Sequence, residues 1–382
     1  MRFPEFTEEW KEERLNEIAE LSKGVGISKE QLSEEGEPCI LYGELYTKYK
    51  FEIIRKVISK TNIESSNLKR SKRNDVIIPC SGETAIDIAV ARCIPFDNIL
   101  LGGDLNIIRL HKDDGAFMAY QLNGKRKIDI AKLAQGVSVV HLYGENIKSI
   151  KTYNPCLQEQ QKIVKLLSML DERVEIQNKI IEKLETLIKG IIELAFSHAA
   201  TSNTLGCYIT QISQRNKIGK DLPVLSVSNK YGFVEQSEQF DDRIIASDDT
   251  SNYKIVNIND FAYNPARINV GSIARLKNKE CGIVSPMYIC FRTLGNIIPE
   301  YLELFFKTKQ FSFEVNKRLE GSVRLCLQYE GLCEIVIPVL PVDKQQIWVT
   351  RITALYAKLA IEKGLQNSFQ AQKQFLLSQM FI

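Results

Sequence analysis

The sequence lacks any apolar run of the length that a membrane span needs. No segment of the 382 residues approaches the roughly 18 consecutive apolar residues of a transmembrane helix. The N-terminal stretch MRFPEFTEEWKEERL is charged and has no apolar core, so it does not resemble an export signal. We therefore expect a cytoplasmic protein without a membrane partner.

Motifs for catalysis and metal binding are missing as well. There is no G-x-x-x-x-G-K-[ST] loop, no G-x-G-x-x-G turn and no G-x-S-x-G elbow. The nine cysteines form no C-x-x-C pair, so we expect reduced thiols and no zinc site. His111, His141 and His198 are far apart in sequence, and each is more typical of a surface or packing residue than of a catalytic base. We expect no catalytic residue, no metal and no cofactor on this chain.

One short stretch comes close to a methyltransferase motif. Tyr263 is followed by Asn264-Pro265-Ala266-Arg267, and amino-methyltransferases carry an N-P-P-aromatic loop whose aromatic residue stacks on the flipped base. Arg267 takes the place of that aromatic residue, and no glycine-rich motif for a methyl donor accompanies it. The stretch is therefore not expected to be catalytic.

The longest regular feature that the sequence predicts is a helix near the middle of the chain. Residues 159–196 contain no proline and a single glycine, Gly190. Their apolar side chains recur in alternating steps of three and four, which is typical of a helix that buries one stripe against another helix. The stripe consists of Leu167, Leu170, Val174, Ile181, Leu184, Ile188, Ile191 and Ala195, interrupted by Gln177.

The chain repeats this segment at its C-terminus. Shifted forward by 185 residues, the segment aligns without gaps on residues 344–381, so that Gln160 falls on Gln345 and Phe196 on Phe381. Two such stripes favour an antiparallel helix pair, and internal two-fold symmetry suits a two-fold partner such as duplex DNA. The second stripe consists of Ile352, Leu355, Leu359, Phe369, Leu376 and Met380, weakened by Gln366 and Lys373.

The remaining sequence forms two regions rich in short β-type runs. VIIPC, NILLGGDLNIIRL and GVSVVHLY alternate with turns in the first region, as PVLSVSN, GSIARL and CGIVSPMYICF do in the second. We predict an α+β fold in which two mixed α/β globules are joined by two long antiparallel coiled-coil helices, with a pseudo-two-fold internal repeat. The predicted boundaries are residues 1–153 and 200–340 for the globules, and 154–199 and 341–382 for the helices.

Candidate binding residues lie in loops of both globules. In the first, the basic cluster Lys69, Arg70, Lys72 and Arg73 precedes the run VIIPC, and Ser81, Glu83 and Thr84 follow it. In the second, the candidates are Asn264, Arg267, Asn269, Ser272, Arg275 and Lys277. Arginine is suited to guanine and asparagine to adenine, and the side chains of both lysine and arginine are suited to phosphate. Solvated loops and ordinary turns use the same residue types, so DNA contact is a hypothesis at this point.

Five stretches of the sequence resemble one known family. They are FPEFTEEWKEERLNEI at the start, YGELYTKY from Tyr42, NPCLQEQQKIVKLLSMLDERVEIQNKIIEKLE from Asn154, YKIVNINDFAYNPARINVGSI from Tyr253, and the terminal helix. Together they span nearly the whole chain in the order found in that family. The sequence resembles the specificity subunit of type I restriction–modification systems.

The resemblance implies two target-recognition domains, each for one half of a split site in double-stranded DNA. It implies that the helices space these domains and dock two methyltransferase subunits, and that restriction and translocation subunits join the complex. It also implies that the chain has no enzymatic activity, with S-adenosylmethionine, ATP and magnesium held by the partner subunits. The sequence departs from the family pattern where Lys344 replaces the glutamate that the first helix carries as Glu159.

Two other functions remain open from the residues. A coiled-coil scaffold that binds only proteins would have the same helices, and gel shifts with it would show no sequence preference for DNA. A self-sufficient methyltransferase would need the motifs that are missing, and would bind a methyl donor on its own. The formal net charge of +3 does not separate these possibilities, because phosphate affinity can be shared with partner subunits.

Overall fold

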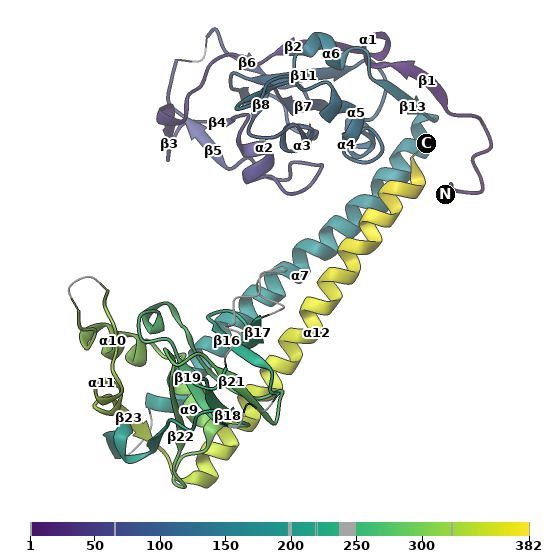
Figure 1. Ribbon diagram of the computed structural model, residues 1–382. Helices are drawn as coiled ribbons and strands as arrows, with labels where there is room; N and C mark the ends of the chain where they lie inside the picture. The colour runs from purple at the N-terminus through teal and green to yellow at the C-terminus, as the bar shows by residue number, and fades with distance from the viewer. Residues whose placement is uncertain are drawn as a thin grey trace. The chain divides into compact units, whose positions relative to one another are not determined.

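The computed structural model describes residues 2–64, 66–197, 201–217, 219, 221–236, 250–321 and 324–381. His198 and parts of the predicted ranges 154–199 and 200–340 lie outside these residues. The chain divides into two compact units, Met1–Lys179 with Gly364–Ile382, and Ile180–Lys363. The two long helices, α7 (Leu157–Ser197, 41 residues) and α12 (Val342–Met380, 39 residues), each contribute to both units (Figure 1). The α+β prediction is confirmed, and each unit is described by itself.

The first unit contains two main sheets and two small ones. One has four antiparallel strands in the order β2 (Ala19–Lys23), β11 (Leu105–Leu110), β7 (Asp75–Pro79) and β9 (Arg92–Ile94). The other has the order β3 (Leu32–Ser33), β5 (Ser59–Thr61), β4 (Glu37–Ile40), β10 (Leu100–Leu101) and β6 (Lys69–Arg70). The small sheets pair β1 (Lys11–Arg14) with β13 (Lys151–Asn154), and β8 (Ser81–Gly82) with β12 (Val140–His141).

Short helices cover the four-stranded sheet of the first unit. Strand β7 is buried along its whole length, because α4 packs on one side of it while apolar residues of the second main sheet cover the other. Leu122, Met118 and Ala119 of α4 belong to the same core as Val76 and Ile78. The helices are α1 (Leu15–Ile18), η1 (Lys29–Gln31), α2 (Glu44–Thr47), α3 (Ala85–Ile88), α4 (Gly115–Asn123), α5 (Lys127–Lys132) and α6 (Gly144–Ile147).

The described residues of the second unit also form two main sheets. The first has the order β15 (Ile209–Ile212), β22 (Ile289–Thr293), β19 (Phe261–Tyr263) and β20 (Ile273–Arg275). The second has the order β17 (Gly232–Glu235), β16 (Val224–Ser228), β21 (Cys281–Val284) and β18 (Lys254–Asn257). A small sheet pairs β14 (Thr201–Thr204) with β23 (Val336–Val339).

Aromatic side chains fill the core of the second unit. Phe261 and Phe291 stack with ring centroids 5.1 Å apart, and Tyr301 and Phe305 pack against Phe196 near the end of α7. This core anchors α7 to the globular part of the second unit. The described helices there are η2 (Leu205–Cys207), η3 (Ile268–Val270), α9 (Pro299–Phe305), α10 (Lys309–Lys317) and α11 (Tyr329–Cys333).

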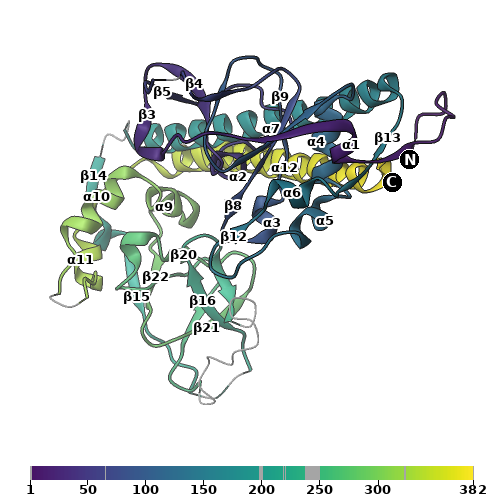
Figure 2. The same ribbon diagram turned by 90° about the horizontal axis from the view of Figure 1, so that it is seen from above.

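In the first unit, the N-terminal part of α7 packs against the C-terminal part of α12, so the two segments run antiparallel. They lie side by side in both views (Figure 2). The apolar contact joins Ile163, Leu167 and Leu170 of α7 to Leu376, Leu377 and Met380 of α12. The polar residues of the second stripe have partners on α7. Lys373 Nζ lies 2.6 Å from Asp171 Oδ1, and the Gln366 amide donates to Asn178 Oδ1.

In the second unit, the C-terminal part of α7 packs against the N-terminal part of α12. Here the buried contact is apolar and joins Ile181, Ile188 and Ile192 of α7 to Val349, Ile352 and Leu359 of α12. At the edge of this contact, Lys363 Nζ lies 2.7 Å from Glu185 Oε1. The apolar stripe of each helix therefore faces the other helix within each unit.

The predicted stripe residues differ in how deeply they lie. Eight of the predicted packing residues are buried: Leu167, Leu170, Val174, Ile181, Ile188, Ile352, Leu359 and Leu376. Four are half-buried: Leu184, Ile191, Leu355 and Phe369. Phe369 lies under the guanidinium of Arg173, whose central carbon is 5.8 Å from the ring centroid, so this position combines an apolar and a cationic contact.

A buried glutamine fixes the start of each long helix. Gln160 accepts from the backbone N–H of Asp114 at 2.8 Å and donates to Pro155 O at 2.9 Å and Asp113 Oδ1 at 2.7 Å. Gln345 accepts from the backbone N–H of Ile298 at 2.9 Å and donates to Leu340 O at 2.7 Å and Asn296 O at 3.1 Å. Both amides are nearly completely buried. They satisfy backbone groups that would otherwise be buried without partners.

The residue before each glutamine differs between the helices. Glu159 is buried and accepts from Arg2 Nε and Nη2, both at 2.7 Å. Lys344 is exposed. With Lys344 at the position of Glu159, α12 lacks, among the described residues, an ion pair like the one that ties the N-terminal segment to α7. The adjacent Gln345 keeps its buried hydrogen bonds.

Each unit also contains an aspartate–arginine pair between neighbouring strands. Arg109 Nη2 lies 2.7 Å from Asp75 Oδ2, and Arg292 Nη2 lies 2.9 Å from Asp260 Oδ2. In both pairs Nε makes a second bond, to the other carboxylate oxygen. Such bidentate pairs fix the relative orientation of the two strands.

We predict that the buried glutamines, unlike their exposed neighbours Gln161 and Gln346, are essential for stability. Gln160→Leu or Gln345→Leu keeps the volume but leaves buried polar groups without partners, which should lower the free energy of unfolding by about 2–4 kcal/mol. The control variants Gln161→Leu and Gln346→Leu should change it by less than about 0.5 kcal/mol. Urea unfolding followed by circular dichroism measures both. If the variants of the buried and of the exposed glutamines lost equal stability, the buried hydrogen bonds would not be the cause.

Candidate nucleic-acid interface

In the first unit, the loop after β7 lies beside a tight turn from another part of the chain. Ser81 on β8 pairs with His141 on β12, and Cys80 O accepts from the backbone N–H of Leu142 at 2.7 Å. Gly136 has a φ of 117°, and a Cβ at this position would lie 2.2 Å from Val139 O. The predicted run GVSVVHLY is therefore mostly a turn, and only Val140–His141 forms a strand.

The polar residues of this loop have different surroundings. Ser81 is buried, and its hydroxyl donates to Asp104 Oδ2 at 3.3 Å. Thr84 caps α3, because its side chain accepts from the backbone N–H of Asp87. Glu83 and Thr84 are exposed. Tyr143, which the sequence analysis did not select, is half-exposed nearby and stacks on His141 with ring centroids 6.2 Å apart.

The basic cluster of the first unit lies on and after β6. Arg70 Nη1 forms an ion pair with Glu37 Oε2 at 2.6 Å, across the sheet. Lys72 and Arg73 are exposed, while Lys69 is half-buried. Among the described residues, no carboxylate forms an ion pair with Lys69, Lys72 or Arg73. These three side chains can therefore meet an external anion without first breaking an internal pair.

In the second unit, the residues after β19 form a closed loop. The backbone N–H of Asn264 donates to Ser272 O at 3.0 Å, and the Asn264 side chain accepts from the backbone N–H of Ala266 at 3.1 Å. Gly271 has a φ of 91°, which favours glycine where the loop turns into β20. Ser272 is buried and donates to a backbone carbonyl, whereas Arg267 and Asn269 are exposed. The loop therefore presents one arginine and one asparagine to solvent.

The aromatic residue before this loop is not available to stack on a base. Tyr263 is completely buried, and its hydroxyl donates to Leu327 O at 3.1 Å. The neighbouring backbone repeats the arrangement of the first unit, since Leu327 N–H donates to Pro265 O at 3.0 Å and Gly321 has a φ of 125°. The resemblance to a methyltransferase loop is thus limited to the sequence.

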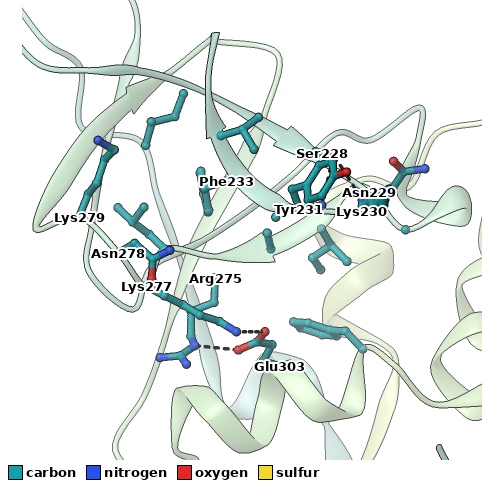
Figure 3. A pocket seen from close by; sticks show the side chains of 18 of the residues that line it. Ser228, Asn229, Lys230, Tyr231, Phe233, Arg275, Lys277, Asn278, Lys279 and Glu303 are labelled. Atoms are coloured by element: carbon teal, nitrogen blue, oxygen red, sulfur yellow. Dashed lines mark hydrogen bonds and ion pairs between the residues drawn. The ribbon is translucent and has the colours of Figure 1, made fainter. Parts of the chain in front are cut away.

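A cavity of about 520 Å³ lies beside this loop, between the β16–β17 hairpin, β20 and the end of α9 (Figure 3). Lys230 and Tyr231 form the tip of the hairpin, and Tyr231 is 70% exposed. Lys279 and Lys307 add positive charge to the lining. These residues were not among the candidates predicted from the sequence, although an N-K-Y-G turn between two β-type runs is a recognisable hairpin signal.

Two predicted contact residues form ion pairs inside this cavity. Arg275 Nε lies 3.0 Å from Glu303 Oε2, and Arg275 Nη1 lies 2.5 Å from Glu300 Oε1. Lys277 Nζ lies 2.5 Å from Glu303 Oε1 (Figure 3). The Arg275 side chain is only 10% exposed. Arg275 therefore forms part of the cavity wall, whereas Lys277 lies at its exposed edge.

Positive charge around Glu303 determines its ionisation. Burial alone would raise the pKa of this carboxyl, but Lys277, together with Lys307 and Arg275, more than offsets the effect and holds the pKa below its ordinary value. Several cations therefore share one carboxylate. The lining has more basic than acidic side chains, so the cavity suits an anionic ligand such as a phosphodiester.

Comparison with known proteins identifies the family. Residues 7–186 match the family model described as the type I restriction modification DNA specificity domain. These residues belong to that family. The match covers the globular part of the first unit, including Lys69–Arg73 and Ser81–Thr84, and it extends into α7.

Solved structures share the fold of the whole chain. The crystal structure of a type I restriction–modification S subunit from M. genitalium matches with a TM-score of 0.62 at 18% identity, over 100% of this chain and 97% of that one. A chain from a structure described as the basis of complex assembly and conformational transition of the type I R-M system matches with a TM-score of 0.59 at 14% identity, over 98% and 97% of the two chains. The likeness therefore includes the second unit, which lies mostly beyond the specificity-domain match.

The described residues contain neither a candidate membrane span nor a candidate metal site. No described helix combines the length and apolar character that a bilayer span requires. Within the described ranges, no three His, Cys, Asp or Glu side chains gather as metal ligands would.

We predict that Glu303 makes the stability of the second unit depend on acid pH. Because its folded-state pKa is lowered, the carboxylate contributes stability above its unfolded-state pKa and loses it as the pH falls through the folded-state value. Glu303→Gln should be less stable than wild type at pH 7, and the difference should shrink between about pH 5 and about pH 3. Thermal unfolding over this range measures the effect. The exposed control Glu280→Gln should leave the profile unchanged, and a pH-independent loss in Glu303→Gln would contradict the prediction.

Proposed function

We propose that this chain is the specificity subunit of a type I restriction–modification complex, and that each globular part recognises one half of a bipartite site in double-stranded DNA. The observation that carries the proposal is the specificity-domain match over residues 7–186. The fold likeness to an S subunit over the whole chain supports extending it to the second unit.

Recurrent contacts support an internal repeat with two DNA-recognising parts. Asp75–Arg109 has its counterpart in Asp260–Arg292, and Gln160 in Gln345. The turn closed by the pairing of Gln135 and His141 corresponds to the turn closed by Glu320 and Cys326. Each turn lies next to the loop that follows β7 or β19, the strands that begin at or directly after the aspartate. The same scaffold thus presents different loop residues, as recognition of two different half-sites requires.

The long helices are the proposed spacer between the two recognition domains. A helix of 41 residues is about 60 Å long at 1.5 Å per residue. Half-sites on one face of B-DNA lie about one turn, or 34–36 Å, apart. Helices of this length are therefore long enough to carry domains that contact two half-sites of one duplex.

The exposed residues of the loops are the proposed DNA contacts. Arg267 and Asn269 are suited to base edges, and Lys69, Lys72 and Arg73 are suited to phosphates. Lys230 and Lys277 at the cavity extend the phosphate contact in the second unit. Ser81, Ser272 and Arg275 support the loops through their internal bonds, and Glu83, Thr84 and Asn264 shape them.

Partner subunits are proposed to supply the chemistry. Two methyltransferase subunits dock on the helices and restriction subunits join them, and S-adenosylmethionine, ATP and magnesium are bound by these partners. Ile176 of α7 and Ile361 of α12 support the docking of two equal subunits, because they occupy the same position in the repeated helix and are 57% and 64% exposed. Exposed apolar residues on helices are typical of protein interfaces.

The first prediction concerns methylation of genomic DNA. Deleting the gene in a host that carries the partner genes should abolish methylation at one split adenine motif, which sequencing of modified bases would detect. Binding of the purified assembly to mixed duplexes should show the same preference in gel shifts. If no motif depends on the gene and the gel shifts show no sequence preference, the chain is a protein scaffold instead.

The second prediction concerns base and phosphate contacts in the second unit. Arg267→Ala should weaken binding of the assembled complex to its own site by about 10-fold to 100-fold, since a bidentate base contact contributes about 1–3 kcal/mol. Lys230→Ala should weaken all duplexes alike and reduce the slope of log affinity against log salt by about 1. Lys317→Ala, exposed on α10, is the control. Loss of affinity in Arg267→Ala that is equal for all sequences would contradict a base contact.

The third prediction concerns subunit docking. Ile176→Asp and Ile361→Asp should each reduce the methyltransferase content of the purified complex from two copies towards one, and the double variant should lose both. Both side chains are exposed, so thermal stability should stay unchanged. Lys183→Asp, exposed on α7, controls for the added negative charge. Mass measurement of the complex gives the answer, and full occupancy in the double variant would rule out these positions.

A further inference from the structure

The contact between α7 and α12 in the first unit contains buried charges. The Asp171 and Lys373 side chains are 2% and 12% exposed and lie 2.6 Å apart. Glu52, 8% exposed, lies 2.5 Å from Lys373 Nζ, and the Tyr120 hydroxyl donates to Asp171 Oδ2 at 2.6 Å. A short distance along the same contact, the Gln366 amide donates to Asn178. Together with the buried Gln177, these two polar pairs interrupt the apolar stripe.

Both polar pairs belong to one antiparallel register. Asp171 and Asn178 are separated by seven residues on α7, as Gln366 and Lys373 are on α12. Two heptad positions of one helix thus meet two heptad positions of the other, in reverse order. The pairs therefore act together, and a shift of either helix along the other would break both.

The repeat does not carry the same polar residues on the opposite helix. At the positions of α7 that correspond to Lys373 and Gln366, the chain has Ile188 and Ile181, both buried in the apolar cluster of the second unit. At the positions of α12 that correspond to Asp171 and Asn178, it has Tyr356 and Lys363. The acid and its amide neighbour are thus found on α7 alone, and the base and its amide neighbour on α12 alone.

We propose that these pairs restrict the helices to pairing α7 with α12, and exclude the pairing of either helix with a second copy of itself. In the same antiparallel register, two copies of α7 would place Asp171 against Ile188 and Asn178 against Ile181. Two copies of α12 would place Lys373 against Tyr356 and Gln366 against Lys363. Each like pairing buries a charge without its counter-ion, which is strongly unfavourable, and a symmetric dimer does so twice.

The polar pairs act on specificity more than on stability. Apolar residues at the same positions would pack as well or better, because a buried ion pair often contributes no more than apolar residues of similar volume. An entirely apolar stripe, however, would accept any similar stripe, including its own copy. A buried polar residue at one position of a helix interface excludes such alternatives. The repeated chain needs this exclusion because its two stripes are otherwise alike.

The test uses the whole chain, cut once. A protease site placed at residues 198–200 separates the N-terminal part from the C-terminal part after the protein has folded. Two preparations that differ in a mass tag are mixed, unfolded in urea and refolded together. Native mass spectrometry then counts the pairs. We expect pairs of unlike parts, with like pairs of the N-terminal part rarer by on the order of 100-fold.

A matched pair of variants shows whether the polar residues are the cause. Asp171→Leu with Asn178→Leu removes the two polar contacts from α7 and should raise the fraction of N-terminal like pairs at least about 10-fold. Glu182→Leu with Lys183→Leu, on the exposed face of α7, should not change it. Should the first variant fail to refold, Lys373→Met with Gln366→Leu tests the same point through like pairs of the C-terminal part. Two results would overturn the proposal. One is a wild-type protein in which like pairs are as frequent as random pairing predicts. The other is a refolded variant without the polar contacts in which the fraction of like pairs does not rise.

Discussion

The structure depends on burying one apolar stripe along each of two long helices. A single helix of this length would leave its stripe in water, and only packing against another surface offsets that cost. Within each unit, α7 and α12 provide that surface for each other. Aromatic side chains of the globular part cover the rest of the two apolar stripes. Each globular part is thereby fixed to a rigid helical segment. The position of its loops follows from this attachment.

Buried hydrogen bonds orient the globular parts on the helices. Gln160 and Gln345 connect the first turn of each helix to a backbone segment just before α4 or α9. Apolar packing is not directional, whereas a buried amide with three partners admits one orientation. The loops that follow β7 and β19 are held in the same way by backbone bonds to a neighbouring turn. A rigid support of this kind suits a surface that distinguishes DNA sequences.

The long helices could be predicted from the sequence because their stripes are periodic over about 40 residues, and local periodicity is directly visible. The run GVSVVHLY could not be assigned, because its apolar residues suggested a strand while Gly136 forms a turn that depends on partners elsewhere. Arg275 was proposed as a base contact, yet it is bound to Glu300 and Glu303, which the sequence places more than twenty residues away. Exposure of a basic side chain depends on such distant carboxylates. Tyr231 was missed because its exposure depends on the hairpin tip projecting from the sheet.

The central claim is that each globular part recognises its own half of the DNA site. Replacing residues 1–153 with the equivalent domain of a related specificity subunit, and leaving α7, the second globule and α12 intact, tests it most directly. The methylated motif is then determined by sequencing modified bases in the host genome. The account predicts that one half of the motif changes, while the other half of the motif and the partner subunits of the complex stay the same. A change in both halves, or in neither, would contradict it.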